Sequence, residues 1–255
     1  MSEDVRVTHG STTPPIGVMD ASYAEDRARK PHLVFRYRCR AEMAARMYER
    51  FRTHERPPRV LDLGSADGRA MAAAHARLGA SESVGIEYDP GLIAHARLPE
   101  GCRLHQGDVT RPHPAAADGS FDLVTALAVL EHVAETEALA KRVFTALKPG
   151  GVFVATCPYP LWDVISGTLR LHKDEHHARN YTRATFEAFA KAGGLDTLAY
   201  RRFMLAPVGF LPYLRLTPSI GMALALDSVI APIPVLNLLC VNQVFAARRP
   251  ITSPA

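Results

Sequence analysis

Short apolar runs alternate with helical segments between residues 59 and 156, and this alternation constrains the fold more than any other feature. Phe121–Leu127 is continuously apolar, as expected for a strand covered on both faces. Repeated strand–helix–strand units predict an α/β fold with a doubly wound, mostly parallel sheet. We expect strands at Arg59–Leu63, Ser83–Glu87, Arg103–Gln106, Phe121–Leu127 and Val152–Thr156, and helices at Arg69–Leu78, Pro90–Leu98 and Glu135–Leu147.

The flanking regions complete this plan. Apolar residues at helical spacing predict an amphipathic helix within 31–56. We interpret the arginines on its other face as a solvated basic face, with an anion site as the alternative. Thr182 is expected to cap a helix that ends at Gly193-Gly194, and strands are expected at Asp196–Phe203 and Leu239–Arg248. We therefore predict a flexible leader over 1–30 and a single domain over 31–255, with an insert at 204–238 before the last strand.

Composition narrows the classes of protein. The 30 Lys and Arg against 26 Asp and Glu form no dense basic block with interleaved aromatics, so we expect no nucleic-acid partner. The four cysteines are far apart, which argues against a zinc site or a disulfide framework and predicts a cytoplasmic location. The first residues lack an apolar segment, so no signal peptide is expected.

A long uncharged stretch runs from Ser228 to Ala247 near the end of the chain. It could cross a bilayer by length alone, but Pro232 and Pro234 interrupt it. We expect a buried or membrane-touching element there rather than a transmembrane helix.

The most informative turn lies in Val60–Arg69, where a strand runs into a glycine-containing loop and then a helix. Such a loop lets backbone N–H groups approach a ligand closely. Asp62 precedes Gly64, where its carboxylate would repel a pyrophosphate, and Gly64 and Gly68 have G-x-x-x-G spacing. Both features disfavour a nicotinamide dehydrogenase, whose loop reads G-x-G-x-x-G.

Carboxylates also close the next two strands. Glu87 follows Gly68 by nineteen positions, where doubly wound nucleotide folds place a carboxylate on the ribose hydroxyls. Asp108 follows the third strand at the same edge of the sheet. Helix capping would explain any one of these carboxylates, whereas three at successive strand ends favour a ligand site.

Five segments together resemble class I S-adenosylmethionine (SAM)-dependent methyltransferases: VLDLGSADGR, VGIEYDP, QGDVTRP, SFDLVTALAVLEHV and LKPGGVFVATCP, in that order. HHARNYTRATFEAFAKAGG is similar to a segment of the ubiquinone-type, small-molecule branch. The resemblance implies a seven-stranded sheet with a reversed last strand and SAM bound across the strand ends. It also implies that Asp62 and Gly64 face the methionine end of SAM, that Glu87 takes the ribose hydroxyls and that Tyr88 flanks the adenine.

The later motifs extend the implied cofactor site. Asp108 would accept from the adenine amino group, Val109 would lie beside the ring, and Ala126 would line the sulfonium side. The chain departs from the family at Ala66, where the central glycine of the first turn is usual. We expect the Ala66 methyl to be tolerated at negative φ and to clash at positive φ.

Candidate catalytic residues follow the fourth strand. His132 is a candidate base or substrate contact, and a locally bonded helix-start residue is the alternative. A base is needed only if the acceptor loses a proton during attack. Some ubiquinone-pathway members carry a carboxylate three residues before the Glu-His pair as part of a candidate metal site; Ala128 stands there before Glu131, so we predict no metal.

The acceptor side is expected to follow the fifth strand. His176 and His177 are further candidates for the base, in a loop that leads to Tyr181 and covers the pocket. Tyr159, Trp162 and Tyr181 are expected to shape the acceptor pocket. The insert is interpreted as a lid, with a platform for a polyprenyl or lipid-linked acceptor at a membrane surface and a homodimer interface as alternatives.

The sequence thus predicts a SAM-dependent methyltransferase acting on a small-molecule acceptor, most simply at oxygen. Methylation of a lipid-linked or isoprenoid acceptor at a membrane surface is the alternative among enzymes. A SAM-binding protein without turnover is the alternative from another class.

Overall fold

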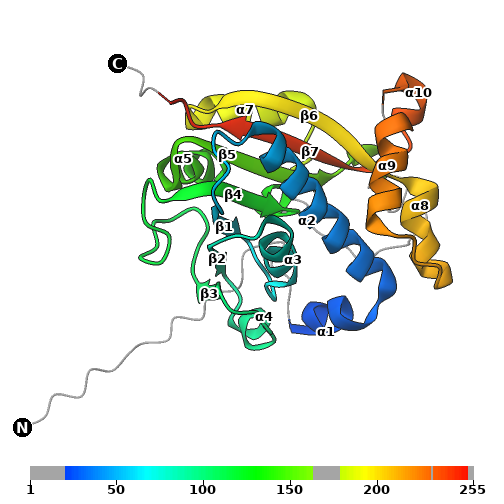
Figure 1. The fold of residues 1–255 in the computed structure, drawn as a ribbon, viewed down its shortest axis with the longest axis horizontal. Coiled ribbons are helices and arrows are strands. Elements are labelled where there is room, and N and C mark those ends of the chain that lie inside the picture. The colour runs from blue at the N-terminus through cyan, green and yellow to red at the C-terminus, as the bar shows by residue number, and fades with distance from the viewer. Residues whose placement is uncertain (1–20, 163–178, 231, 252–255) are drawn as a thin grey trace, which may run out of the picture.

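A seven-stranded sheet runs through the protein in the order β3-β2-β1-β4-β5-β7-β6 (Figure 1). The computed structural model describes residues 21–162, 179–230 and 232–251. Only β7 runs antiparallel to its neighbours, β5 and β6. The predicted doubly wound sheet with a reversed last strand is therefore confirmed. The strands are β1 (Arg59–Leu63), β2 (Glu82–Glu87), β3 (Cys102–Gln106), β4 (Phe121–Leu127), β5 (Leu147–Pro158), β6 (Asp196–Leu205) and β7 (Cys240–Arg248).

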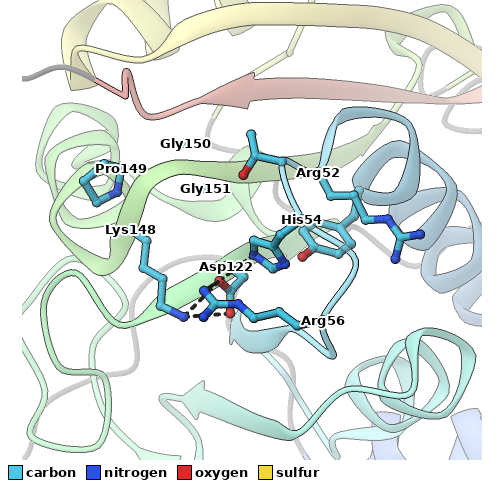
Figure 2. Close-up of a pocket in the computed structure, with 10 residues that line it drawn as sticks. Arg52, His54, Arg56, Asp122, Lys148, Pro149, Gly150 and Gly151 are labelled. Carbon is cyan, nitrogen blue, oxygen red and sulfur yellow. Dashed lines mark hydrogen bonds and ion pairs between the residues drawn. The ribbon is translucent and has the colours of Figure 1, made fainter.

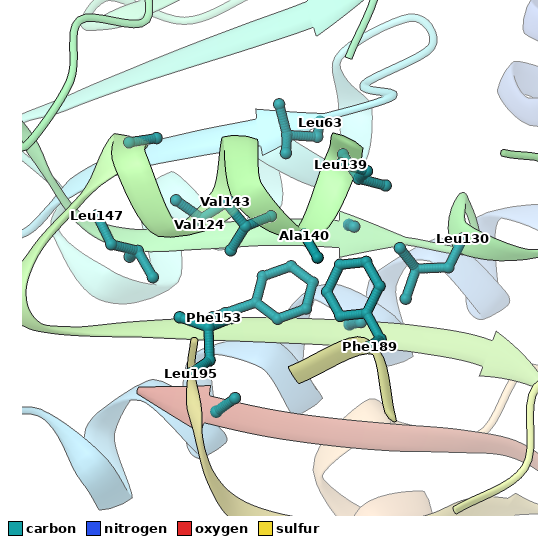
Figure 3. Packing of buried hydrophobic residues seen from close by; sticks show 14 of the residues in the cluster. Leu63, Val124, Leu130, Leu139, Ala140, Val143, Leu147, Phe153, Phe189 and Leu195 are labelled. Carbon is teal, nitrogen blue, oxygen red and sulfur yellow. The ribbon is translucent and has the colours of Figure 1, made fainter. Parts of the chain in front are cut away.

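Helices cover both faces of this sheet. One face carries α2 (Pro31–Phe51), against which α3 (Arg69–Leu78) and α9 (Ile220–Ile230) pack. The other face carries α5 (Thr136–Ala146) and α7 (Arg183–Gly193). Figure 3 shows Leu139, Ala140 and Val143 of α5 packing toward Phe153 of β5 and Phe189 of α7. The two apolar clusters hold the strands rigidly, so the loops at the strand ends have a fixed platform.

Local chemistry sets the ends of several helices where the sequence predicts them. Thr182 caps α7 by accepting from the Thr185 N–H at 3.4 Å, and Gly194 ends the helix at φ +72°. Gly79 ends α3 in the same left-handed conformation, which glycine adopts without a Cβ clash. The predicted cap and stop of α7 are confirmed.

The structure differs from the expectation at the leader and at the start of β5. Residues 21–29 of the predicted leader form α1 (Ala21–Arg29), whose Arg27 is only 7% exposed and pairs with Asp67 at 3.1 Å. β5 begins at Leu147 rather than Val152. The chain stays in the sheet between these residues, where the pairing of β5 with β4 shifts register between Phe121 and Leu123. Gly150 allows this path at φ +79°.

The insert at 204–238 folds into short helices beside the end of β6. They are α8 (Ala206–Phe210), η2 (Leu211–Leu214), α9 and α10 (Pro234–Asn237). Buried Asp227 of α9 accepts from the N–H groups of Met204 and Leu205 at 2.6 and 3.0 Å, which ties the insert to the sheet. None of the helices in the described residues is long and apolar enough to cross a membrane.

Two short elements complete the loops at the carboxyl ends of the strands. α4 (Pro90–Ala94) follows β2 and is shorter than predicted, with Asp89 as its N-cap. The 3₁₀ turn η1 (Leu130–His132) follows β4. The loops after β1 to β4 meet at one edge of the sheet, which we call the cofactor edge.

Candidate functional site

The loop between β1 and α3 alternates left-handed residues at the cofactor edge. Gly64, Ala66 and Gly68 have φ of +71°, +50° and +75°. A Cβ on Gly64 would lie 2.6 Å from Val129, and one on Gly68 would lie 2.5 Å from Leu98, so both positions require glycine. Ala66 has the positive φ at which we expected its methyl to be unfavourable, and an alanine in this region carries a strain of about 1–2 kcal/mol.

Asp62 lies buried where β1 enters this loop. Its carboxylate accepts from the Thr125 hydroxyl of β4 at 2.6 Å, and its backbone carbonyl accepts from Ser65 Oγ at 2.8 Å. Burial, only partly opposed by these hydroxyls, raises the pKa of Asp62 to about 6. The side chain is thus a buried carboxyl, held in place at the start of the glycine loop.

Glu87 joins this loop to the end of β2. One carboxylate oxygen accepts from the Ala66 N–H at 2.7 Å, and the other accepts from the N–H groups of Tyr88 and Asp89 at 2.8 and 3.0 Å. Burial raises the pKa of Glu87, although these three backbone donors oppose the rise. A carboxylate has about four acceptor positions, so Glu87 retains capacity for a further donor.

The remaining predicted cofactor residues lie along the same edge. Tyr88 is partly exposed next to Glu87, and Ala126 is buried at the end of β4. Asp108 follows β3 and accepts from the Thr110 N–H and hydroxyl at 2.8 and 2.7 Å. Burial favours a higher pKa for Asp108, but these bonds and nearby Arg111 outweigh it and lower the value. Val109 packs partly buried against the core.

One buried ion pair at this edge was not predicted from the sequence. Asp67 in the glycine loop is 1% exposed and lies 3.1 Å from Arg27 of α1 and 2.9 Å from Arg69 of α3. Asp67 was visible only as an unusual residue before Gly68. Arg27 gave no signal, because its burial depends on a contact with a distant part of the chain.

η1 presents a second residue that the sequence did not single out. Glu131, next to His132, is 3% exposed, and its carboxyl interacts with the Cys157 thiol of β5, while neither of its oxygens has a nitrogen or oxygen hydrogen-bond partner among the described residues. Burial and then the nearby Glu131 raise the pKa of the Cys157 thiol on β5 well above its usual range. The candidate bases His176 and His177 lie outside the described residues.

The three predicted acceptor-pocket aromatics take different positions. Tyr159 follows β5, and the Arg202 guanidinium of β6 stacks on its ring at 3.8 Å from the centroid. Trp162 donates to the Leu238 carbonyl at 3.1 Å, which joins it to the insert. Tyr181 is buried, and its carbonyl accepts from Gln243 at 2.7 Å. Tyr181 is therefore part of the core beside the site, whereas Tyr159 and Trp162 lie toward the insert.

The part of the chain that the structure describes contains no cluster of potential metal ligands. No three His, Cys, Asp or Glu side chains converge there as ligands.

Comparisons with known proteins agree with this geometry. A family described as "Methyltransferase domain" matches residues 35–200, and the chain belongs to this methyltransferase family, as its motifs predict. It is 35% identical over 101 residues to trans-aconitate 2-methyltransferase of Delftia acidovorans, covering 39% of this chain and 37% of that protein. It is 36% identical over 151 residues to the ubiquinone biosynthesis O-methyltransferase of Xanthomonas euvesicatoria pv. vesicatoria, covering 54% of this chain and 62% of that protein.

The matched regions thus span about two fifths to three fifths of these curated relatives. Among solved structures, the fold resembles a chain in the complex between the Haloferax volcanii Trm112 methyltransferase activator and a putative methyltransferase. The TM-score is 0.63 at 19% identity, with 92% of this chain and 96% of that chain covered. At this identity the likeness concerns the fold alone.

Proposed function

We propose that the protein transfers the methyl group of SAM to an oxygen atom of a small-molecule acceptor. The observation that carries the proposal is the arrangement of the cofactor edge. A loop with left-handed residues follows β1 there, and Asp62, Glu87 and Asp108 lie at the carboxyl ends of the adjacent strands β1, β2 and β3. At Gly64 and Gly68 a Cβ would clash, so the backbone there is built for close packing. Bound SAM would supply an electrophilic methyl group on a sulfonium.

The assignments in this site follow the strand order. Asp62 and Gly64 are assigned to the methionine end, Glu87 to the ribose hydroxyls and Tyr88 to one side of the adenine. Glu87 suits its role because a free acceptor position remains beside its three backbone donors.

The other end of the cofactor site comes from β3 and β4. Asp108 is assigned to the adenine amino group and Val109 to the face of the ring. Ala126 is small and lies at the end of β4, which suits contact on the sulfonium side.

Methyl transfer is an in-line displacement in which the acceptor oxygen bonds to carbon as the sulfur–carbon bond breaks. The protein must align the acceptor and exclude water. An acceptor hydroxyl must also lose its proton, so a base is required. We assign this role to η1, with Glu131 as proton acceptor and His132 as a contact to the acceptor, because the buried Glu131 carboxyl has no nitrogen or oxygen partner among the described residues and interacts only weakly with a thiol, that of Cys157.

Methyl-transfer assays test the proposal. The full chain is incubated with SAM and either trans-aconitate or a prenylated catechol, and release of S-adenosylhomocysteine (SAH) is measured. We expect acceptor-dependent release with one of them, since the relatives' names include a carboxylate and a ubiquinone-pathway O-methylation. SAH binding without turnover on any hydroxyl or carboxylate acceptor would instead indicate a SAM-binding protein.

We also propose a cytoplasmic location, which the free, buried cysteines favour.

A lipid-linked acceptor at a membrane surface is the second candidate, and the insert carries the observation that favours it. Large apolar side chains are exposed on it, including Leu214, Val229 and Val235 at 71, 70 and 73%. α9 carries no charge except the buried Asp227, and Arg36 and Arg215 lie near the η2 end of the insert. Such a surface suits shallow insertion between anionic lipid headgroups.

Vesicle sedimentation separates the two candidates. We expect the wild type to sediment with phosphatidylglycerol vesicles and the double variant V229D/V235D to remain in solution, with unchanged affinity for SAH. Ile251→Asp is the matched control, because Ile251 is 67% exposed and lies outside the insert. If the wild type does not sediment, a small soluble acceptor is favoured.

A further inference from the structure

A polar cavity lies at the end of the sheet opposite the cofactor edge (Figure 2). It has a volume of about 40 Å³ and lies where the end of α2, the α2–β1 connection and the starts of β4 and β5 meet. Because β1 and β4 run in parallel, their first residues face this cavity and their last residues face the cofactor edge. Its polar lining consists of Tyr48, Arg52, His54, Arg56, Asp122 and Lys148.

Positive charge exceeds negative charge in this cavity. Buried Asp122 accepts from Lys148 at 2.8 and 2.9 Å, from Arg56 at 3.0 Å and from His54 Nε2 at 3.0 Å. Burial alone would raise the pKa of Asp122, but Lys148 and the other donors lower it, so the group is a carboxylate at neutral pH. Arg52 adds a third permanent cation.

The negative groups do not balance these cations. Arg52, Arg56 and Lys148 are three cations against the two carboxylates of Asp122 and Glu55, and water screens the charges of Arg56 and Glu55, whose side chains are 60% and 84% exposed. Asp122 also accepts from the Arg59 N–H at 2.9 Å, which leaves its two oxygens little capacity for further donors. The lining therefore carries one more positive than negative charge.

Two buried polar atoms in the lining have no partner. The Tyr48 side chain is 1% exposed, and neither its hydroxyl nor His54 Nδ1 has a hydrogen-bond partner among the described residues. Burial, and then the charge of Asp122, raise the pKa of Tyr48 to about 12, so the hydroxyl is a proton donor at neutral pH. A buried hydroxyl without a partner is unfavourable, and an acceptor in the cavity would remove that cost.

We propose that this cavity binds a small inorganic oxyanion, phosphate or sulfate. The anion would accept from the Tyr48 hydroxyl and face the cations Arg52, Arg56 and Lys148. One water needs roughly 10–15 Å³ of such volume, so the cavity holds about three waters or one tetrahedral oxyanion. Because the cavity and the cofactor edge lie at opposite ends of the strands, the anion and SAH bind together.

Calorimetric titration of the full chain tests the proposal, in buffer of constant ionic strength set with sodium chloride. We expect sodium phosphate to bind saturably, with the same affinity in the presence and absence of SAH. Tyr48→Phe and Arg56→Gln should each weaken phosphate binding about tenfold. Arg103→Gln is the control, since it removes an exposed arginine on β3.

Thermal unfolding distinguishes binding from a general salt effect. Phosphate and sulfate stabilise many proteins by exclusion from their surface, and that effect would be equal in all variants. We expect the phosphate-dependent rise in melting temperature to be reduced in Tyr48→Phe and Arg56→Gln and kept in Arg103→Gln. An equal rise in all four proteins, or no saturable heat of phosphate binding, would overturn the proposal. Neither result bears on methyl transfer, because the assay contains no acceptor.

Discussion

The cofactor half of the molecule, β1 to β4 with the loops after β1 to β3, differs from the acceptor half, which comprises η1, β5 to β7 and the insert. In the cofactor half the buried carboxylates of Asp62, Asp67 and Glu87 all accept from donors on neighbouring elements. In the acceptor half the Glu131 carboxyl and the Thr156 hydroxyl are buried without a nitrogen or oxygen partner among the described residues.

The two halves also differ at the surface. Most exposed large apolar side chains of the described residues belong to the insert and its flanks, including Met222 and Leu216. A ligand site that is complete before its ligand arrives is preorganised, which reduces the cost of binding. We infer that the cofactor half is preorganised, whereas the acceptor half keeps polar and apolar groups available for a partner.

We expect the largest effect on turnover from a substitution of Glu131 in the acceptor half. With a hydroxyl acceptor, Glu131→Gln should lower kcat about 100-fold or more, because it removes the proposed proton acceptor, whereas methylation of a carboxylate needs no base and should be little affected. The same substitution should not lower the free energy of unfolding, since it replaces a buried charge by a neutral amide of the same size. Turnover is measured with the acceptor that the methyl-transfer assay identifies, and stability by urea denaturation.

Glu137→Gln, at an exposed position on α5, is the control and should change neither quantity. A Glu131→Gln enzyme with wild-type turnover of a hydroxyl acceptor would show that Glu131 is only a structural residue.

The pH dependence of stability tests the buried carboxyl in the cofactor half. The pKa of Asp62 is about 6 in the folded protein against an ordinary value of 3.8, so between these values the folded state binds the proton more tightly. The contribution of Asp62 to stability is therefore present below pH 3.8 and is lost as the pH rises through 6. A difference of two pKa units corresponds to about 3 kcal/mol.

Asp62→Asn does not titrate, so its stability relative to wild type should increase by about 3 kcal/mol from pH 4 to pH 7. Urea denaturation at both pH values measures this difference, and Asp196→Asn, on the exposed start of β6, should show no such change. Equal differences at the two pH values would mean that Asp62 is not perturbed by burial.

Loss of the Glu87 carboxylate in the cofactor half should weaken the binding of SAH. Glu87→Ala should raise the Kd for SAH by an amount equivalent to about 1–3 kcal/mol, because it removes the carboxylate assigned to the ribose. Glu82→Ala, at the opposite end of the same strand, is the matched control. Unchanged SAH affinity in Glu87→Ala would refute the ribose assignment.

The smallest expected effect concerns the strain in the glycine loop. Ala66 has φ +50°, so Ala66→Gly should raise the free energy of unfolding by about 1 kcal/mol or less. The gain is limited because glycine also increases the entropy of the unfolded chain. Ala72→Gly in α3, where the backbone is helical, should lower stability by a similar amount. A loss of stability in Ala66→Gly would show that the alanine methyl is favourable there.

These two halves were not equally predictable from sequence. The bounds of β1 and β4 match the prediction, because continuous apolar runs lie between turn residues. The strand-end carboxylates could be placed for the same reason, since parallel strands end at one edge.

What remained hidden depends on contacts between distant residues. α1 is mostly polar, and only the pairing of Arg27 with Asp67 explains its place in the fold. The lack of a nitrogen or oxygen partner for Glu131 among the described residues and the left-handed conformation of Ala66 are set by tertiary packing, which periodicity does not encode. The insert carried no strand–helix alternation, so its helices could not be assigned.

Calorimetric titration of the wild-type chain with SAH, and separately with NADH, tests the central claim most directly. We expect saturable binding of SAH at one site per chain and no binding of NADH. Binding of NADH alone would contradict it, because the cofactor edge would then belong to a dehydrogenase.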